Sequence, residues 1–376
     1  MGAFLCALQF TEYLYKMKFK DIIHANNSRP SVRPMMQKDA FPISDQFSTY
    51  LKQYGRDIAL PILYSDLINY SYADSLKDKA GKWTYWENAV YPPDQLQAIT
   101  SNLIKTYQLI KRHCVAAQQT EYQIERIDFC EYGNSVPFRI KIVDSANGTV
   151  DFFYIKLADA SRVYGLELEH LLTPHPINFL CHKNTLVEEH IEGVPGDVFL
   201  QKNKLLSQVE KKNIAKAFVR FSESCFVRLL GDMRCYNFVV NSDSESEPTQ
   251  YVIRAIDFDQ QCYEGSKSCY FPQLYKENEA YVEMVLNNLD NPEIEQIQQA
   301  ELAAMAKKIL IFGRQSVALF DSMVQDELSE NYKIGLLRSE LNDYFKTIQF
   351  SSCTTMGAIV KEQLERGLQL YLKNSF

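Results

Sequence analysis

The pattern of apolar and polar positions predicts helices in the first third of the chain and strands after it. Residues 46–71 and 93–119 repeat apolar side chains at the spacing of an amphipathic helix. In the second stretch these side chains are Leu96, Ile99, Leu103, Tyr107 and Ile110. Residues 24–45 are polar, carry three prolines and are typical of an irregular connector. We therefore expect residues 1–120 to form a helical N-terminal extension.

The pattern of apolar residues changes near residue 122, where strand-like runs alternate with turn signals up to residue 158. The turn Asn147-Gly148 suits a hairpin, because a type I′ turn needs positive φ at both central residues. These features predict a three-stranded antiparallel meander. Ser161 is the candidate N-cap of the helix that follows. Beyond the meander we expect a helix at 161–172 and strands at 177–182 and 185–191.

The rest of the chain is predicted to be mostly helical, apart from two short paired strands around the polar turn at 241–248. The helical stretches lie at 211–230, 296–347 and 357–373. This order of elements predicts an α+β fold with two lobes. The predicted lobes are an antiparallel-sheet lobe at 121–192 and a mostly helical lobe at 193–376.

Composition narrows the classes of function without identifying one. The chain has 376 residues, of which 46% are hydrophobic and 23% are charged, as in ordinary globular proteins. Its net charge of −7 gives no support for binding nucleic acid or anionic membranes. We also expect no membrane span, because no uninterrupted apolar run is long enough. The nine cysteines form no CxxC pair, which predicts reduced thiols and a cytoplasmic location.

The most informative segment is residues 228–260, where polar side chains follow apolar elements at suggestive spacings. Asp232 and Asn237 lie five positions apart at the end of a helical pattern, and Asp257 lies twenty positions after Asn237 at the end of a strand. Two carboxylates and one amide at the ends of neighbouring elements can hold Mg²⁺ on a nucleotide and orient a hydroxyl nucleophile. Taken alone, each spacing is equally typical of a turn.

The order of elements and motifs between residues 122 and 265 resembles the protein-kinase-like fold, most closely the aminoglycoside/choline-kinase-type phosphotransferases. The segment GDMRCYN (231–237) is similar to the kinase catalytic loop. The resemblance implies that Asp232 is the catalytic base and that Asn237 is a Mg²⁺ ligand. One departure is Leu230, which stands where kinases usually carry histidine. The first 120 residues lie outside the resemblance.

The segment AIDFDQQ (255–261) is similar to the second metal site of kinases. The resemblance implies that Asp257 binds the Mg²⁺ that bridges the phosphates and that Asp259 adds a second ligand. In the strand FYIKLA (153–158), Lys156 is unusual because a buried ammonium group needs a partner. The resemblance makes Lys156 the lysine on the nucleotide phosphates, with Glu167 or Glu169 as its ion-pair partner.

The resemblance also implies two places where backbone groups bind the nucleotide. The hairpin at 131–138 would cradle phosphate through N–H groups near Gly133, Asn134 and Ser135, although it carries one glycine where protein kinases have three. The segment LVEEHIEGVPGD resembles the hinge that contacts adenine. Its contact residues would be Glu189, His190 and Ile191.

The expected function is an ATP- and Mg²⁺-dependent phosphotransferase that acts on a hydroxyl of an unidentified small molecule or protein. Two alternatives stay open: a catalytically inactive kinase-like module that binds nucleotide or protein, and a kinase-fold enzyme that transfers AMP. The expected partners are the nucleotide and the unknown acceptor, with no nucleic acid. The N-terminal extension is a candidate surface for a dimer or another partner.

Overall fold

The computed structural model divides the chain into two compact units, which we call the sheet unit and the helical unit. The sheet unit contains residues 35–166 and 176–190, and the helical unit contains residues 167–175 and 191–376. Most of the predicted connector and Gly133 lie outside the described residues. The structure describes residues 38–78, 80–111, 121–131, 134–202, 205–243 and 249–373.

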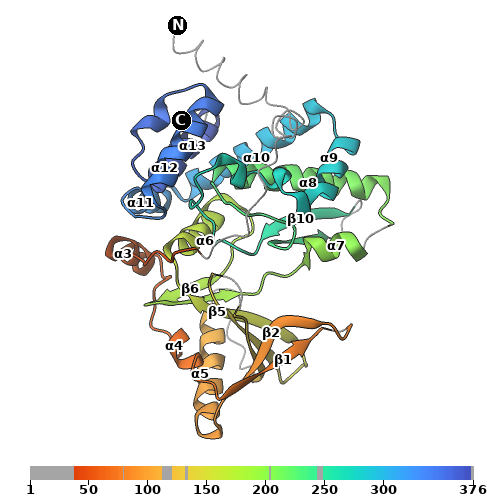
Figure 1. The fold of residues 1–376 in the computed structure, drawn as a ribbon, viewed down its shortest axis with the longest axis vertical. Coiled ribbons are helices and arrows are strands. Elements are labelled where there is room, and N and C mark those ends of the chain that lie inside the picture. Colours follow the sequence, from red (N-terminus) through yellow and green to blue (C-terminus); the bar gives the residue numbers. More distant parts are fainter. Residues whose placement is uncertain are drawn as a thin grey trace. The chain divides into compact units, whose positions relative to one another are not determined.

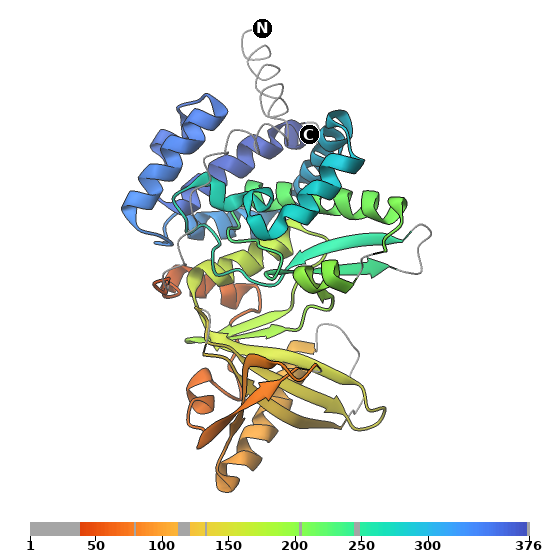
Figure 2. The ribbon, with the colours of Figure 1, turned by 45° about the vertical axis from the view of Figure 1, so that its right-hand side comes forward.

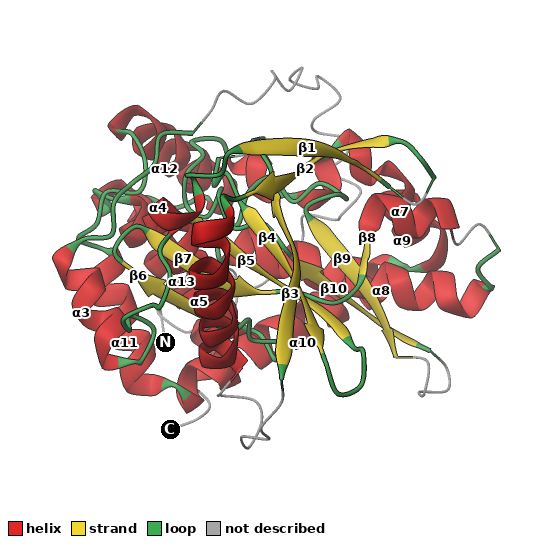
Figure 3. Ribbon diagram, turned by 90° about the horizontal axis from the view of Figure 1, so that it is seen from below, coloured by secondary structure: helices red, strands yellow, loops and turns green. Residues whose placement is uncertain are grey.

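The sheet unit is built on one seven-stranded antiparallel sheet with the order β1-β2-β3-β4-β5-β7-β6 (Figure 3). The predicted meander is confirmed as the neighbours β3, β4 and β5, and the two further predicted strands pair with each other beside β5. The strands are β1 Tyr72–Lys77, β2 Trp83–Val90, β3 Tyr122–Phe129, β4 Phe138–Asp144, β5 Val150–Leu157, β6 Phe179–His182 and β7 Thr185–Glu189.

Alternation of apolar side chains explains which face of this sheet is buried. In β4, Phe138, Ile140 and Ile142 point to the core while the residues between them are half-buried. The hairpin from β4 to β5 turns at Gly148, which has a φ of 73°. Glycine adopts this positive φ without steric cost because it has no Cβ atom. Register and buried face are therefore fixed together, because a slip of one residue would turn every apolar side chain outward.

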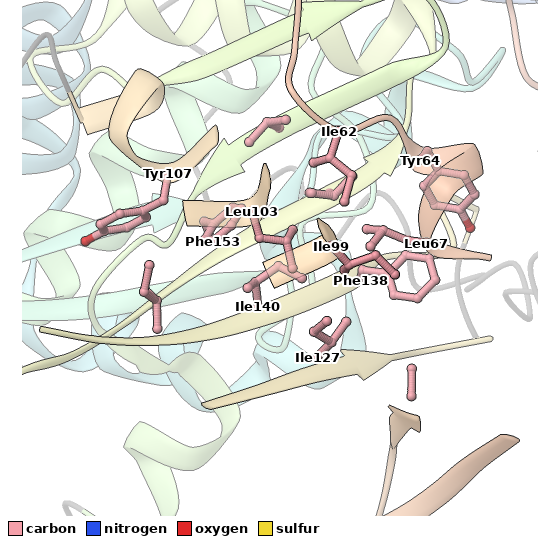
Figure 4. Close-up of a cluster of buried hydrophobic side chains, with 14 of the residues drawn as sticks. Ile62, Tyr64, Leu67, Ile99, Leu103, Tyr107, Ile127, Phe138, Ile140 and Phe153 are labelled. Carbon is pink, nitrogen blue, oxygen red and sulfur yellow. The ribbon is translucent and has the colours of Figure 1, made fainter. Parts of the chain in front are cut away.

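Helix α5 (Pro93–Lys111) covers the core face of the sheet (Figures 3 and 4). Its buried stripe includes Ile99, Leu103 and Tyr107, as its periodicity predicted, whereas Leu96 at the start of the predicted stripe is exposed. Tyr107 packs against Phe153 of β5 with 5.6 Å between ring centroids. The other helices that begin in this unit are α3 Asp45–Gln53, α4 Tyr64–Leu67 and α6 Ala160–Leu172.

Two predictions for this part of the chain are wrong in detail. Residues 72–90 form β1 and β2, so the N-terminal segment is not helical throughout but extends the sheet. Helix α6 is capped by Asp159 and not by Ser161, because the Asp159 carboxylate accepts a hydrogen bond from the Arg162 N–H at 3.2 Å. Asp159 also accepts from Lys38 Nζ at 2.7 Å, which ties the start of the described chain to the start of α6.

The helical unit contains a three-stranded antiparallel sheet with the order β10-β9-β8 and a set of helices that pack around α8. The fold class is therefore α+β, as predicted. The strands are β8 Val194–Pro195, β9 Phe238–Asp243 and β10 Gln250–Ala255. The helices are α7 Gly196–Lys202, α8 Gln208–Val227, α9 Glu279–Asn288, α10 Asn291–Ile311, α11 Gly313–Met323, α12 Asn331–Phe345 and α13 Met356–Lys373.

Helix α8 is the centre of this unit and lies beside the β9–β10 hairpin (Figures 1 and 2). It begins with a capping box in which Ser207 and Glu210 satisfy each other's backbone N–H groups. Phe221 packs edge-on against Phe238 of β9 with 5.1 Å between ring centroids. This contact holds α8 against β9, the strand that starts directly after the predicted catalytic loop.

Glycine at position 357 is required by a close backbone approach, and we expect Gly357→Ala to destabilise the protein. A Cβ atom at Gly357, near the start of α13, would overlap the carbonyl group of Met323 at the end of α11. The expected loss is about 1–3 kcal/mol, the usual cost of overpacking a core. The matched control is Gly335→Ala in α12, where a Cβ meets nothing within 4 Å. This control should be neutral or slightly stabilising, as measured by urea unfolding.

Two other predictions concern the whole chain. None of the helices in the described ranges combines the length and hydropathy needed to cross a membrane. The cysteines of the described residues form no disulfide and are mostly buried, and burial raises the pKa of thiols such as Cys181 and Cys225 to about 12. These thiols are therefore protonated at neutral pH and unreactive.

Candidate active site

The helical unit brings together the two segments that carry the predicted acidic residues. Leu230 and Gln261 form an antiparallel bridge, although they are thirty-one positions apart in the sequence. Beside this bridge, the Cys262 N–H donates to the Leu229 carbonyl at 2.8 Å. Leu230 is fully buried, so the position that differs from kinases has a packing role. The segment that leads into Asp232 therefore lies directly beside the segment that follows Asp257.

The predicted catalytic loop is folded around the pair Asp232 and Asn237. Asn237 Nδ2 donates to the Asp232 carbonyl at 2.8 Å and lies 3.3 Å from Asp232 Oδ2. On the other side, the Ile256 N–H donates to the Asn237 carbonyl at 3.0 Å, which links the loop to the residue before Asp257. Asp232 adopts a φ of 57°, a left-handed conformation that aspartate tolerates better than most residues. The sequence spacing has thus brought both side chains into contact.

Arg234 is a site residue that the sequence analysis did not identify. Its Nε donates to Asp232 Oδ1 at 2.8 Å, and its NH1 group lies 3.0 Å from Glu277 Oε1. Its guanidinium group also lies over the ring of Tyr275, 5.1 Å from the centroid. The sequence signal that could have identified Arg234 is its position, two residues after Asp232, where a basic side chain can pair with that carboxylate. Arg234 fixes the orientation of the Asp232 carboxylate.

The Asp232 carboxyl group is electrostatically unusual. Burial raises its pKa to about 6, against the opposing effect of Arg234. The negative charges of Asp257 and Glu277 raise the pKa of Asp232 further. A carboxyl group with a pKa near neutrality can accept a proton during a reaction and release it again afterwards.

Asp257 and Asp259 form a tight turn at the end of β10. The Asp259 N–H donates to Asp257 Oδ1 at 3.0 Å, as in an Asx turn, and Asp259 is 5% exposed. The residue between them, Phe258, is fully buried and anchors the turn. The turn therefore holds Asp257 in a defined position at the strand end.

The donor set fits a magnesium ion that is bound together with a nucleotide. Among the described residues, no group of three or more His, Cys, Asp or Glu side chains is arranged to hold a metal by itself. Mg²⁺ does not require such a cage, because it usually binds one or two carboxylates plus the oxygens of substrate phosphates. Asn237 Nδ2 makes the hydrogen bonds to Asp232, so its Oδ1 atom is the one suited to a cation. A cation near Asp232 and Asp257 would also offset their mutual repulsion.

In the sheet unit, Lys156 pairs with an acidic residue that the sequence analysis did not consider. Lys156 Nζ lies 2.5 Å from Glu188 Oε2, on the neighbouring strand β7, and Arg162 NH1 lies 3.1 Å from Glu188 Oε1. All three side chains are buried. Burial alone would raise the pKa of Glu188, but the charges of Lys156 and Arg162 outweigh it and hold that pKa below its ordinary value. Glu188 therefore pairs with two buried cationic side chains, one of which is Lys156.

The two glutamates proposed as partners of Lys156 have different surroundings. Glu169 forms a buried ion pair with Arg228, which lies just after α8. Glu167 is fully buried and accepts a hydrogen bond from Gln315 Nε2 at 3.3 Å. The pairing of Lys156 with Glu167 stays a prediction.

Several of the residues predicted to bind nucleotide through their backbones make hydrogen bonds within the sheet unit. Asn134 Oδ1 accepts from the Lys38 N–H at 3.1 Å, and the Ser135 carbonyl accepts from the Leu157 N–H at 3.2 Å. In the predicted hinge, the Glu189 carboxylate accepts from the Asn178 N–H at 2.7 Å. His190 Nδ1 lies 3.2 Å from the hydroxyl of Tyr154, and Ile191 is buried. Gly133 lies outside the described residues.

Comparison with known proteins gave matches among solved structures only. No protein family and no curated protein matches the chain. The chain is similar to the autoinhibited serine kinase domain of the giant muscle protein titin, with a TM-score of 0.26 and 11% identity over 67% of this chain and 81% of that chain. It is also similar to Rad53 in complex with AMP-PNP, with a TM-score of 0.25 and 12% identity over 63% of this chain and 60% of that chain. Because both TM-scores are below 0.5, no site residue is assigned from these two structures.

Proposed function

We propose that this chain is a kinase-like phosphotransferase that moves the γ-phosphoryl group of ATP to a hydroxyl group of a second molecule. The observation that carries the proposal is the cluster of Asp232, Asn237 and Asp257 in the helical unit. The bridge between Leu230 and Gln261 positions this cluster. Burial raises the pKa of Asp232 within it to about 6. A proton acceptor beside a carboxylate and an amide that suit Mg²⁺ is the set of groups that phosphoryl transfer requires.

Asp232 has the central role in the proposed reaction. Its carboxylate accepts the proton of the acceptor hydroxyl as the hydroxyl oxygen bonds to the γ-phosphorus of ATP and the bond from that phosphorus to the β,γ-bridging oxygen breaks. The products are the phosphorylated acceptor and ADP, and the proton passes from Asp232 to solvent. Arg234 holds the carboxylate through the 2.8 Å hydrogen bond to Oδ1. Asp232 therefore needs to be unprotonated at the start of each cycle.

The remaining residues bind and orient the nucleotide. Asn237 and Asp257 are the proposed Mg²⁺ ligands, with Asp259 as an additional one. When bound, the ion neutralises negative charge that builds up on the phosphate oxygens. Lys156 is proposed to hold the phosphates. The backbone groups near Asn134 and Ser135, and those of residues 189–191, are the proposed contacts for phosphate and adenine.

We expect Mg²⁺·ATP to stabilise the native protein against heat and to stabilise Asp257→Ala much less. A ligand that binds only the folded state adds about 2.7 kcal/mol of stability at about 100 times its dissociation constant. Removal of the Asp257 carboxylate takes away a proposed metal ligand, so the affinity for Mg²⁺·ATP should fall. The measurement is the melting temperature with ATP, with and without Mg²⁺.

The control is Asp343→Ala, because Asp343 is an exposed aspartate on α12, away from the cluster. This variant should respond to Mg²⁺·ATP as the native protein does. The proposal fails if the native protein shows no magnesium-dependent shift, or if Asp257→Ala shows the same shift as the native protein.

A further inference from the structure

The helical unit contains a cavity of about 260 Å³ that none of the proposed active-site residues lines. Its walls come from the end of α6 and the following loop, the C-terminal half of α8, strand β10 and one residue of α10. Helix α8 and β10, which form two of these walls, lie side by side (Figure 2). Binding pockets for small molecules usually start at about 300 Å³, so this cavity suits a small ligand.

The cavity has an excess of positive charge. Arg220, Arg228 and Arg254 line it, against the carboxylates of Glu169 and Glu301. Burial raises the pKa of Glu301 although Arg220 and Arg228 oppose that effect. Arg228 is paired with Glu169, and Glu301 is the other carboxylate of the lining beside Arg220 and Arg254, so an anion in the cavity would balance the remaining positive charge.

Two buried polar atoms of the cavity wall have unmet hydrogen-bonding capacity. Ser224 Oγ and Arg228 Nε are buried and have no hydrogen-bond partner among the described residues. The two residues lie one turn apart, at the end of α8, so they share a face of that helix. Ser224 is 5% exposed and Arg228 is 2% exposed. Buried polar groups in native proteins nearly always have partners, so these two atoms can each take one more hydrogen bond.

We infer that this cavity is a binding site for a small molecule that carries a phosphate group. Arginine is the preferred residue for phosphate because its planar guanidinium group donates two parallel hydrogen bonds. The volume leaves room for the phosphate and a short organic remainder. Arg228 also links the cavity to the catalytic segment, because its carbonyl accepts from Gln261 Nε2 and Asp232 follows four positions later. The bound molecule would therefore contact the segment that supports Asp232.

The test is calorimetric titration of inorganic phosphate into the full-length protein without Mg²⁺, with chloride keeping the ionic strength constant. We expect one saturable site. Affinity should fall at least tenfold in the double variant Arg220→Gln/Arg254→Gln. Ser224→Ala removes one hydroxyl and leaves the packing intact, and it should weaken binding about threefold to tenfold. The buried Arg228 is kept in every variant, since the fold depends on it.

Two control variants separate this site from other surfaces. Arg314→Gln removes an exposed arginine on α11 outside the cavity, and Asp257→Ala alters the proposed active site; both should bind phosphate as the native protein does. The inference is overturned if no saturable heat is observed, if the double variant binds as tightly as the native protein, or if acetate binds as tightly as phosphate. It is also overturned if Lys156→Met abolishes phosphate binding, because the phosphate would then occupy the nucleotide site.

Discussion

Replacement of Asp232 with asparagine is expected to lower the rate of phosphotransfer by about 10²–10⁴-fold, the usual contribution of a positioned general base. The asparagine oxygen can still accept the hydrogen bond that Arg234 Nε now donates to Oδ1 at 2.8 Å. It cannot accept the proton of the acceptor hydroxyl. The loss should therefore appear in the rate and leave Mg²⁺·ATP binding and the melting temperature nearly unchanged.

The measurement is ADP formation in the presence of Mg²⁺, first with water as acceptor and then with a small-molecule extract as the source of acceptors. Asp343→Asn changes an exposed aspartate of the same unit and should keep the native rate. An Asp232→Asn protein as active as the native one would rule out a base at this position. Nucleotide binding without any turnover would favour an inactive binding module. Product masses would distinguish phosphoryl transfer from AMP transfer.

The pH dependence of the rate provides a second readout of the same residue. Burial raises the pKa of Asp232 to about 6, so this carboxyl group takes up a proton as the pH falls through that value. Because the unprotonated form is the active one, the native rate should be constant above this pH and fall by about tenfold for each pH unit below it. The residual rate of Asp232→Asn should lack this dependence.

The core of the sheet unit could be predicted because local signals and burial agree there. In β4, apolar side chains alternate with half-buried ones, and Asn147-Gly148 marks the hairpin that follows. The strands β1 and β2 escaped prediction because their burial is weak. In β1 no residue is fully buried, so the alternation that normally identifies a strand is missing. These two strands are held in the sheet by their backbone hydrogen bonds to each other and by the pairing of β2 with β3, and not by burial of an apolar face.

The acidic half of the candidate site could be predicted because its residues follow closely in sequence on a loop and a strand end. Asp232, Asn237 and Asp257 lie on two segments that the backbone bridge between Leu230 and Gln261 joins. Ion-pair partners could not be predicted in the same way. Glu188 lies on β7 and pairs with Lys156 on the neighbouring strand β5. The resemblance to kinases assigns the segment around Glu188 to a hinge that binds through its backbone, so it gives no reason to expect this ion pair. Which charged side chains form ion pairs depends on how distant segments pack, so the pairs cannot be predicted from neighbouring residues of a single sequence.

The ion pair between Arg228 and Glu169 leads to the second large effect. Both side chains are almost fully buried, with 2% and 5% of their surfaces exposed. Removal of one partner leaves the other charge buried and unpaired, which usually costs about 3–5 kcal/mol. We therefore expect Arg228→Met to lower the free energy of unfolding by about that amount, measured in urea. Lys212→Met provides the contrast, because its pair with Glu293 is 2.6 Å long but over one third exposed.

An exposed pair of this kind contributes about 0–1 kcal/mol, so Lys212→Met should change the unfolding midpoint little. The double variant Arg228→Met/Glu169→Leu distinguishes the loss of an attraction from the burial of an uncompensated charge. Since both charges are then absent, it should recover most of the stability lost in Arg228→Met. If the double variant is as unstable as the single one, the cost comes from packing around Phe258, whose ring lies 5.9 Å from the Arg228 guanidinium carbon. If Arg228→Met alone is as stable as the native protein, the pair does not hold α6 against α8.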